Sequence, residues 1–186
     1  KMREDLLTPL AKAWSTDRAI DVTNTGVQIH GGMGFMSDTA AAQFYLDARI
    51  TPIYEGTNGI QAIDLVGRKL SMNNGAAMAA MLADIRSTAR EARGTNEPKL
   101  VGVADRLDAA AAALDEATQW MIATMKTARE TALSGATAYL RLAGDVDPHM
   151  LAPSRHGEQV GVGDAERIAQ QVLLAFELLV DPFQPV

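Results

Sequence analysis

Cysteine is absent from this chain of 186 residues, and aromatic residues make up only 5% of it. Without cysteine the chain can form no disulfide, no thiolate zinc site, no iron–sulfur cluster and no cysteine nucleophile. With so few aromatic residues, the core must be filled by Ala, Leu, Ile, Val and nine Met. This composition favours closely packed helices over an aromatic-rich β-sandwich.

Positive charge is also scarce, since 17 Lys and Arg face 23 Asp and Glu for a net charge of −6. An acidic chain is a poor candidate for nucleic-acid binding, which needs a basic face. No apolar run approaches the roughly 18 residues of a membrane-spanning helix, and no signal-peptide pattern follows the charges of residues 1–5. We therefore expect a cytoplasmic protein with no membrane partner. A first residue other than Met indicates a fragment.

Apolar residues at spacings of three and four predict an all-α helical bundle, because no useful alternating pattern indicates a strand. The predicted helices cover residues 6–32, 38–49, 58–70, 76–93, 99–130 and 164–180. Residues 131–143 either continue the fifth of these helices or bend it at Gly135.

Turn and cap residues divide these helices. Ser37 or Asp38 is the expected N-cap of the second helix, and Thr57 that of the third. Residues 73–75, Asn-Asn-Gly, predict a turn. Residues 144–163 contain two prolines and predict a loop.

The densest unusual stretch lies between Gln28 and Gln61, and it opens with the glycine cluster of residues 31–34. Three glycines in four residues either let a ligand approach the backbone closely or simply end a helix and form a turn. The cluster is neither a Rossmann fingerprint nor a P-loop, because no strand precedes it and no Gly-Lys-Ser/Thr follows.

Histidine gives no sign of a metal centre. His149 and His156 are seven residues apart, which matches no standard zinc spacing, and His30 stands beside glycines. No nucleophile elbow accompanies these histidines either, so we expect neither a metal nor a serine triad.

Glu55 follows two apolar residues and precedes the predicted helix start at Thr57. A carboxylate in an apolar pocket acquires a raised pKa and can serve as a general base. The alternative is a carboxylate that only interacts with the dipole of the following helix. The free N–H groups from residue 57 onward either cradle an anion such as phosphate or are capped by Thr57 itself.

Three segments together resemble the C-terminal helical domain of acyl-CoA dehydrogenases, in the order and spacing of that family. They are Gln-Ile-His-Gly-Gly-Met-Gly-Phe at 28–35, Asp-Ala-Arg at 47–49, and Ile-Tyr-Glu-Gly-Thr-Asn-Gly-Ile-Gln at 53–61. The resemblance covers about residues 8–70. Residues 75–143 resemble the extra helical extension of one bacterial branch, which includes dehydrogenases similar to those for 3-methylthiopropionyl-CoA.

The resemblance implies two parts. Residues 1–75 are the later part of the C-terminal helical bundle, and residues 76–186 are a helical extension. It also implies FAD-dependent α,β-dehydrogenation of an acyl-CoA thioester. Glu55 matches the base that removes the α-proton, while the β-hydrogen leaves as hydride to flavin N5. The Glu55 N–H would polarise the thioester carbonyl. Tyr54 would wall the acyl pocket, and Gly56 would contact the substrate through its backbone.

The resemblance further implies a set of residues that contact FAD. They are Gln28, Ile29, His30, Gly31, Gly32, Thr57 and Gly59. The first five match a segment that reaches the cofactor of a neighbouring subunit, which implies a homo-oligomer. Gly59 stands where the family often has glutamine. Arg49 has a simpler alternative, an ion pair with Asp47 or with a neighbouring helix.

In the family the flavin ring lies between a β-barrel and the helices, and no such barrel is present here. We therefore expect the isolated chain to be inactive, and the parent enzyme to pass electrons to an electron-transfer flavoprotein. Two alternatives stay open: a non-catalytic helical module for oligomerisation or partner binding, and an acyl-CoA oxidase. Whether Glu55 faces a pocket or solvent separates the first alternative from the enzyme.

Overall fold

The computed structural model describes residues 1–95 and 97–147, which are helical and contain no strand, so the predicted all-α fold is confirmed. The main helices are α1 (Met2–Ile29), α2 (Gly32–Phe35), α3 (Ala41–Arg49), α4 (Asn58–Asp64), α5 (Ala76–Gly94), α6 (Pro98–Thr127), α7 (Arg129–Ser134) and α8 (Ala136–Val146). Shorter helical segments are η1 (Ser37–Thr39), the π-helical η2 (Leu65–Lys69) and η3 (Met72–Gly75). The helix predicted at 164–180 lies outside the described residues.

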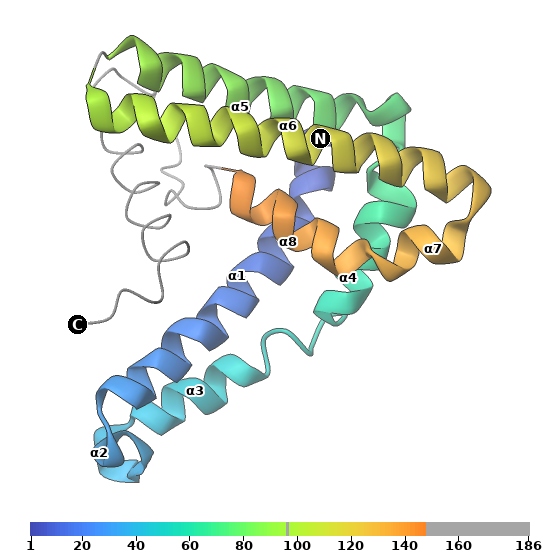
Figure 1. Ribbon diagram of the computed structural model, residues 1–186. Coiled ribbons are helices and arrows are strands. Elements are labelled where there is room, and N and C mark those ends of the chain that lie inside the picture. The colour runs from blue at the N-terminus through green and yellow to red at the C-terminus, as the bar shows by residue number, and fades with distance from the viewer. Residues whose placement is uncertain (96, 148–186) are drawn as a thin grey trace.

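The helices form an upper pair and a projecting arm (Figure 1). α5 and α6 pack against each other at the top, and α1 runs downward from beneath them. α3 returns beside the far half of α1, with α2 at the reversal; we call residues 20–50 the arm. α8 crosses beneath α6 and contacts both α1 and α4.

One hydrophobic core joins the two halves of the sequence. Its members include Leu6, Leu10, Ala13, Leu65, Val66, Met78, Ile85, Leu107, Leu114, Met121, Tyr139, Leu140 and Ala143. All the buried residues of α1 lie in its first half, between Leu6 and Ala13. The second half of α1 therefore leaves the core and carries the arm outward. A boundary near residue 75 stays a prediction.

The glycine cluster makes the reversal at the end of the arm. α1 ends at Ile29, and Gly31 adopts a φ of +59°, which an L side chain rarely takes. Gly34 is buried against α1, where an added Cβ would lie 2.3 Å from the Val27 carbonyl oxygen. The backbone conformation of Gly31 and the close packing of Gly34 therefore explain why glycine stands at these two positions, without any ligand.

The two predicted N-caps have different outcomes. Thr57 caps α4 as predicted, because its Oγ1 accepts a hydrogen bond from the Ile60 N–H at 3.3 Å. The prediction of Ser37 or Asp38 as a cap was wrong. These residues form η1, and α3 begins only after Ala40, whose φ is +58°. The Thr39 hydroxyl ties η1 to α2 by donating to the Met33 carbonyl oxygen at 2.8 Å.

The helix predicted over residues 99–130 ends earlier than expected, whereas the helical region that follows it extends further than expected. α6 ends at Thr127, because the next residue, Ala128, has a non-helical φ of −146°, and a second break follows at Gly135. The prediction of a loop from residue 144 was wrong at its start, because α8 continues to Val146. Gly144 is a packing position, since an added Cβ would lie 2.4 Å from Trp14 Cδ1.

Candidate functional site

Glu55 lies on a tight reversal between α3 and α4. The N–H groups of Ile53 and Tyr54 both donate to the Ile50 carbonyl, at 3.0 and 3.1 Å, and extend the end of α3 by one turn. Glu55 and Gly56 then take φ values of +55° and +85°. A left-handed conformation is uncommon for a residue other than glycine, and it persists only where the surroundings fix it. We call residues 53–57 the Glu55 turn.

Three contacts hold the Glu55 turn. The Gly56 carbonyl accepts from Lys12 Nζ at 2.9 Å, the Glu55 carbonyl accepts from Gln61 Nε2 at 3.4 Å, and the Asn58 N–H donates to the Pro52 carbonyl at 3.1 Å. The Glu55 N–H has no acceptor in the part of the chain that the structure describes. Both carbonyls of the reversal are therefore used internally, and a backbone donor remains beside the carboxylate.

The Glu55 side chain faces solvent in this chain. Glu55 is exposed, and the neighbouring Ile53 and Tyr54 are 47% and 49% exposed. The apolar pocket that the sequence suggested around this carboxylate is not formed by the described residues. A dry environment for Glu55 requires surfaces that these residues do not supply.

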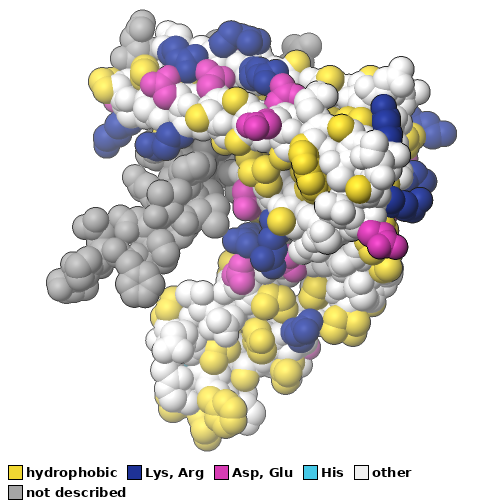
Figure 2. Space-filling view, turned by 45° about the vertical axis from the view of Figure 1, so that its right-hand side comes forward, with side chains coloured by type: hydrophobic (Ala, Val, Ile, Leu, Met, Phe, Trp, Pro, Cys, Tyr) yellow, Lys and Arg dark blue, Asp and Glu magenta, His cyan; other side chains and the backbone are white. Residues whose placement is uncertain are grey.

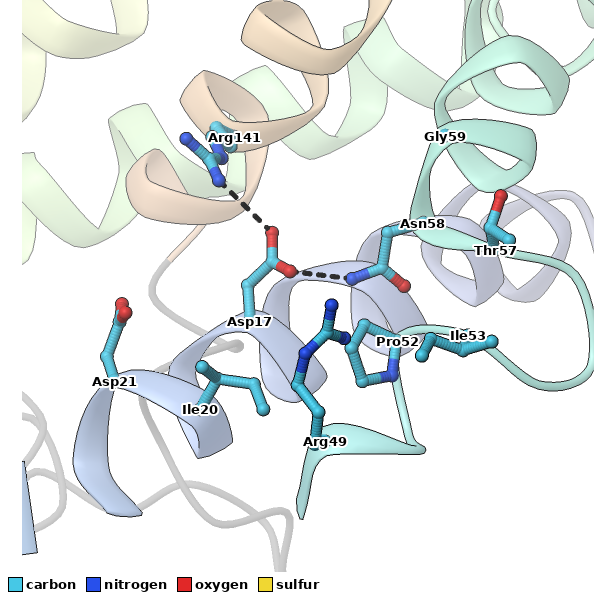
Figure 3. A pocket seen from close by; sticks show the side chains of 10 residues that line it. All are labelled: Asp17, Ile20, Asp21, Arg49, Pro52, Ile53, Thr57, Asn58, Gly59 and Arg141. Atoms are coloured by element: carbon cyan, nitrogen blue, oxygen red, sulfur yellow. Dashed lines mark hydrogen bonds and ion pairs between the residues drawn. The ribbon is translucent and has the colours of Figure 1, made fainter. Parts of the chain in front are cut away.

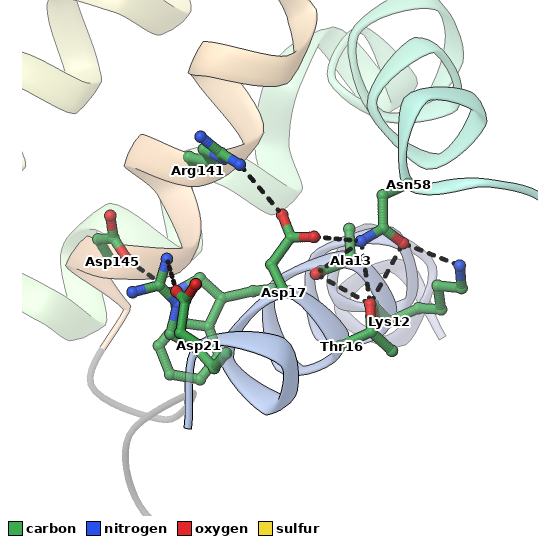
Figure 4. A network of polar contacts seen from close by, with 10 residues as sticks. Lys12, Ala13, Thr16, Asp17, Asp21, Asn58, Arg141 and Asp145 are labelled. Carbon is green, nitrogen blue, oxygen red and sulfur yellow. Dashed lines mark hydrogen bonds and ion pairs between the residues drawn. The ribbon is translucent and has the colours of Figure 1, made fainter. Parts of the chain in front are cut away.

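A polar network beneath the turn centres on Asn58 and joins three helices (Figure 4). Asn58 Nδ2 lies 2.7 Å from Asp17 Oδ1, 3.0 Å from Thr16 Oγ1 and 3.1 Å from the Ala13 carbonyl oxygen. Asn58 Oδ1 accepts from Lys12 Nζ at 2.8 Å. Asp17 Oδ2 lies 3.6 Å from Arg141 NH2 of α8. The network thus runs from α8 through α1 to the first residue of α4.

An open pocket of about 480 Å³ lies where α1, α4 and α8 meet (Figure 3). It is lined by Asp17, Ile20, Asp21, Arg49, Pro52, Ile53, Thr57, Asn58, Gly59 and Arg141. Of the predicted site residues, Thr57 and Gly59 belong to this lining. Glu55, Tyr54 and Gly56 do not. Two carboxylates and two guanidinium groups give the pocket a balanced charge.

The two predicted cofactor segments are far apart in this chain. Gln28 to Gly32 lie exposed at the end of α1, whereas Thr57 is at the start of α4, next to Asn58, whose amide lies 3.0 Å from Thr16 Oγ1. The 13 residue-to-residue steps from Thr16 to Ile29 span about 20 Å at the rise of an α-helix. A Cβ added at Gly31 or Gly32 would meet no atom within 4 Å, so this backbone is open to a ligand from outside. The described residues bring the two segments into no single enclosed site.

Sequence reasoning missed the residues that fix the turn, namely Lys12, Asp17, Asn58 and Arg141. Lys12 and Thr16 lie one helical turn apart on α1, and this spacing was the signal available in the sequence. Their shared partner Asn58 could not be predicted, because it reaches them only when α4 packs against α1. The suggested pairing of Arg49 with Asp47 was wrong. Asp47 accepts from Gln43 Nε2 at 2.7 Å, and Arg49 forms no ion pair within the described residues, with Asp47 or with a neighbouring helix.

Metal ligands do not gather in the part of the chain that the structure describes, where no group of three or more His, Cys, Asp or Glu could hold an ion. The three histidines of the sequence divide between His30, which is exposed at the end of the arm, and two residues outside the described ranges. Within residues 1–95 and 97–147, no helix combines the length and the apolar character needed to cross a bilayer.

Comparisons with known proteins agree with this geometry. Residues 2–71 match the family model described as acyl-CoA dehydrogenase, C-terminal domain. Residues 81–147 match a second model, described as acetyl-CoA dehydrogenase C-terminal like. The break between the two matched ranges falls at η3 and the start of α5.

Individual relatives match over different lengths. The chain is 37% identical to 3-methylmercaptopropionyl-CoA dehydrogenase of Ruegeria pomeroyi over 95% of its own length, but it spans only 31% of that relative. It is 41% identical to the mitochondrial short-chain specific acyl-CoA dehydrogenase of Rattus norvegicus over 61 residues, which are 33% of this chain and 15% of that enzyme.

A solved structure has the same fold. The crystal structure of Caenorhabditis elegans ACDH-11 in complex with C11-CoA aligns with 99% of this chain and 34% of its own, at a TM-score of 0.61 and 20% identity. Two family models in succession, a relative matched over almost the whole chain and a shared fold lead to one conclusion. The chain belongs to the acyl-CoA dehydrogenase family and corresponds to its C-terminal helical region.

Proposed function

We propose that this chain acts as the C-terminal part of a longer FAD-dependent enzyme that dehydrogenates an acyl-CoA thioester between its α and β carbons. The observation that carries the proposal is the Glu55 turn, which presents one carboxylate beside an unused backbone N–H. The relative from Ruegeria pomeroyi is named for this class of reaction, and the chain spans 31% of it. The remaining length of such an enzyme would supply the cover that Glu55 lacks here.

In this proposal Glu55 is the base that removes the α-proton of the substrate. Its backbone N–H donates to the thioester carbonyl and stabilises the negative charge that develops on that oxygen. FAD, when bound, supplies the acceptor for the β-hydrogen as hydride, at flavin N5. Tyr54 walls the acyl group, and Gly56 contacts the substrate through its backbone. The reaction needs no metal and no covalent intermediate.

The cofactor contacts divide between subunits in this proposal. Thr57 and Gly59 face the FAD of their own subunit, and residues 28–32 at the end of the arm reach that of a neighbour. The separation of the two segments along α1 supports this division. The enzyme is then a homo-oligomer, with an electron-transfer flavoprotein as its partner. Its cytoplasmic location stays a prediction.

The test is turnover of the full-length protein that carries this chain, purified with its flavin. Butyryl-CoA and 3-methylmercaptopropionyl-CoA are suitable probes, because relatives are named for them. Glu55→Gln should lower kcat by about 10²–10⁴-fold, the usual contribution of a general base, while flavin content stays unchanged. Near-normal turnover of this variant contradicts the assignment of the base. Comparing an artificial electron acceptor with oxygen alone separates a dehydrogenase from an oxidase.

The solvent-facing Glu55 and the exposed apolar arm favour a second candidate, a non-catalytic helical module for self-association. Large apolar side chains gather there: Val22, Ile29, Met33, Phe35, Met36, Phe44, Leu46 and Ile50 are each 49–83% exposed. Figure 2 shows hydrophobic side chains spread over this lower part of the molecule. A full-length protein that assembles into oligomers but neither binds flavin nor oxidises acyl-CoA would favour this candidate.

A further inference from the structure

The geometry points to Lys12 as a positioning residue that holds the Glu55 turn in its catalytic conformation from outside the turn. This inference rests on the proposed function, since it assigns Lys12 to the same reaction. Lys12 touches no reacting atom in this account. It acts on Glu55 through the carbonyl of the next residue.

The Glu55 turn needs an external support. Glu55 is not glycine, its φ is +55°, and its side chain is exposed, so packing around the side chain does not fix the backbone. The bonds from Gln61 and to Pro52 are made within the same stretch of chain. Among the described residues, Lys12 is the only side chain from outside residues 50–64 that bonds the backbone of the turn, with Nζ 2.9 Å from the Gly56 carbonyl oxygen.

Lys12 is itself held in place (Figure 4). Its ammonium also donates to Asn58 Oδ1 at 2.8 Å, and Asn58 is in turn fixed by Thr16 and Asp17 of α1. Lys12 is half-buried, and its neighbours Leu10 and Ala13 on α1 are 0% exposed. One ammonium thus joins the Gly56 carbonyl to a helix anchored in the core. A charged donor makes such a bond stronger than a neutral one.

Loss of this bond should affect chemistry more than substrate binding. The Glu55 carboxylate must lie near the substrate α-carbon, and a shift of about 1 Å in a reacting group can cost about 100-fold in rate. Within the turn Lys12 bonds only the Gly56 carbonyl oxygen and makes no hydrogen bond to Tyr54. We therefore expect a lower kcat with little change in KM.

The test compares three variants of the full-length protein that carries this chain. Lys12→Met keeps the aliphatic stem and removes the ammonium, so kcat should fall about 10–100-fold, while KM changes less than about threefold and flavin content is unchanged. Lys12→Arg keeps a donor and should recover part of kcat. Arg3→Met is the control. This substitution removes a cation of the same helix that lies 2.7 Å from Asp84 and has no contact with the turn. The kcat of this variant should stay within about twofold of the wild type.

A second readout does not depend on turnover. Amide hydrogen exchange of Asn58, whose N–H closes the turn on Pro52, should become about tenfold faster in Lys12→Met than in the wild type or in Arg3→Met. Unchanged exchange together with kcat within twofold of the wild type overturns the inference. A fall in kcat that is explained by loss of flavin, or that Arg3→Met shows as well, also overturns the inference. If the wild type itself does not oxidise acyl-CoA, the proposed function fails, while exchange at Asn58 still decides whether Lys12 holds the turn.

Discussion

At the scale of single residues, the buried hydroxyl pair of Thr118 and Tyr139 joins α6 to α8. Thr118 and Tyr139 are 3% and 2% exposed, and their oxygens are 2.7 Å apart. The Thr118 hydroxyl also lies 2.7 Å from the Leu114 carbonyl oxygen, which can only accept. The single Thr118 hydrogen therefore goes to Leu114, and Tyr139 donates to Thr118.

This direction of donation predicts unequal costs of mutation. Tyr139→Phe leaves Thr118 bonded to Leu114 and should lower the free energy of unfolding by about 0.5–1.5 kcal/mol. Thr118→Val leaves the Tyr139 hydroxyl buried without an acceptor and should cost about 1–3 kcal/mol. Urea denaturation of both variants checks the order. A larger loss for Tyr139→Phe would show that the donation runs the other way.

Tyr139 also predicts a dependence of stability on alkaline pH. Burial raises the pKa of Tyr139 above its ordinary value of 10, because the phenolate would lose its hydration. The folded state therefore disfavours ionisation. The contribution of Tyr139 to stability is complete below about pH 10 and falls as pH rises further. Unfolding free energies between pH 8 and 11 should decline less steeply in Tyr139→Phe, and parallel curves would contradict this explanation.

At this scale the sequence allowed some assignments and not others. Thr57 could be recognised as a cap from its position alone, because capping is local. Glu55 could be singled out as a candidate base from its apolar neighbours, but only the family motif around it favoured that role over a simple helix-dipole interaction. The role of Lys12 could not be predicted from its spacing to Thr16 alone, since its partners Gly56 and Asn58 lie more than 40 residues away in sequence and become neighbours only when α4 packs on α1.

At the scale of helices, the ends that depend on local chemistry could be predicted from the sequence. The turn at 73–75 was correct because Asn73, Asn74 and Gly75 all take positive φ, and α6 begins at Pro98, where a missing N–H costs nothing. α8 was cut short in the prediction because glycine commonly ends a helix. At Gly144 tertiary packing decides instead, since the glycine admits the Trp14 ring.

Gly144 therefore predicts a test of how α8 packs on α1. Gly144→Ala would place Cβ 2.4 Å from Trp14 Cδ1, and the forced shift should cost about 1–3 kcal/mol in the free energy of unfolding. Gly102→Ala in α6 is the matched control, because an added Cβ there meets no atom within 4 Å. That variant should be neutral or more stable by up to about 1 kcal/mol. Equal effects in denaturant melts would contradict the packing of α8 on Trp14.

At the scale of the whole molecule, family and fold could be predicted because the motif of residues 28–61 is specific and the helical periodicity is strong. The environment of Glu55 could not be predicted, because a motif says which residues recur and not which surfaces cover them. In this chain the arm and the Glu55 turn both remain exposed. Both features fit a piece whose partner surfaces lie beyond the described residues.

The exposure of both proposed cofactor segments predicts that the 186-residue chain alone does not retain FAD. After incubation at about 20 µM with excess FAD and desalting, its absorbance spectrum should show no flavin band. The physical reason is that the two segments, about 20 Å apart along α1, enclose nothing by themselves. A retained flavin band with altered vibrational structure would mean that the chain builds a cofactor site by itself.

The most direct test of the central claim, that Glu55 is the base of an acyl-CoA dehydrogenase, is anaerobic flavin reduction in a single turnover. The full-length protein is mixed with excess acyl-CoA, and the loss of oxidised-flavin absorbance is followed by stopped flow. We predict rapid reduction by the wild type and a rate about 10²–10⁴-fold lower in Glu55→Gln, with equal flavin content in both. Equal reduction rates in the two proteins would contradict the account.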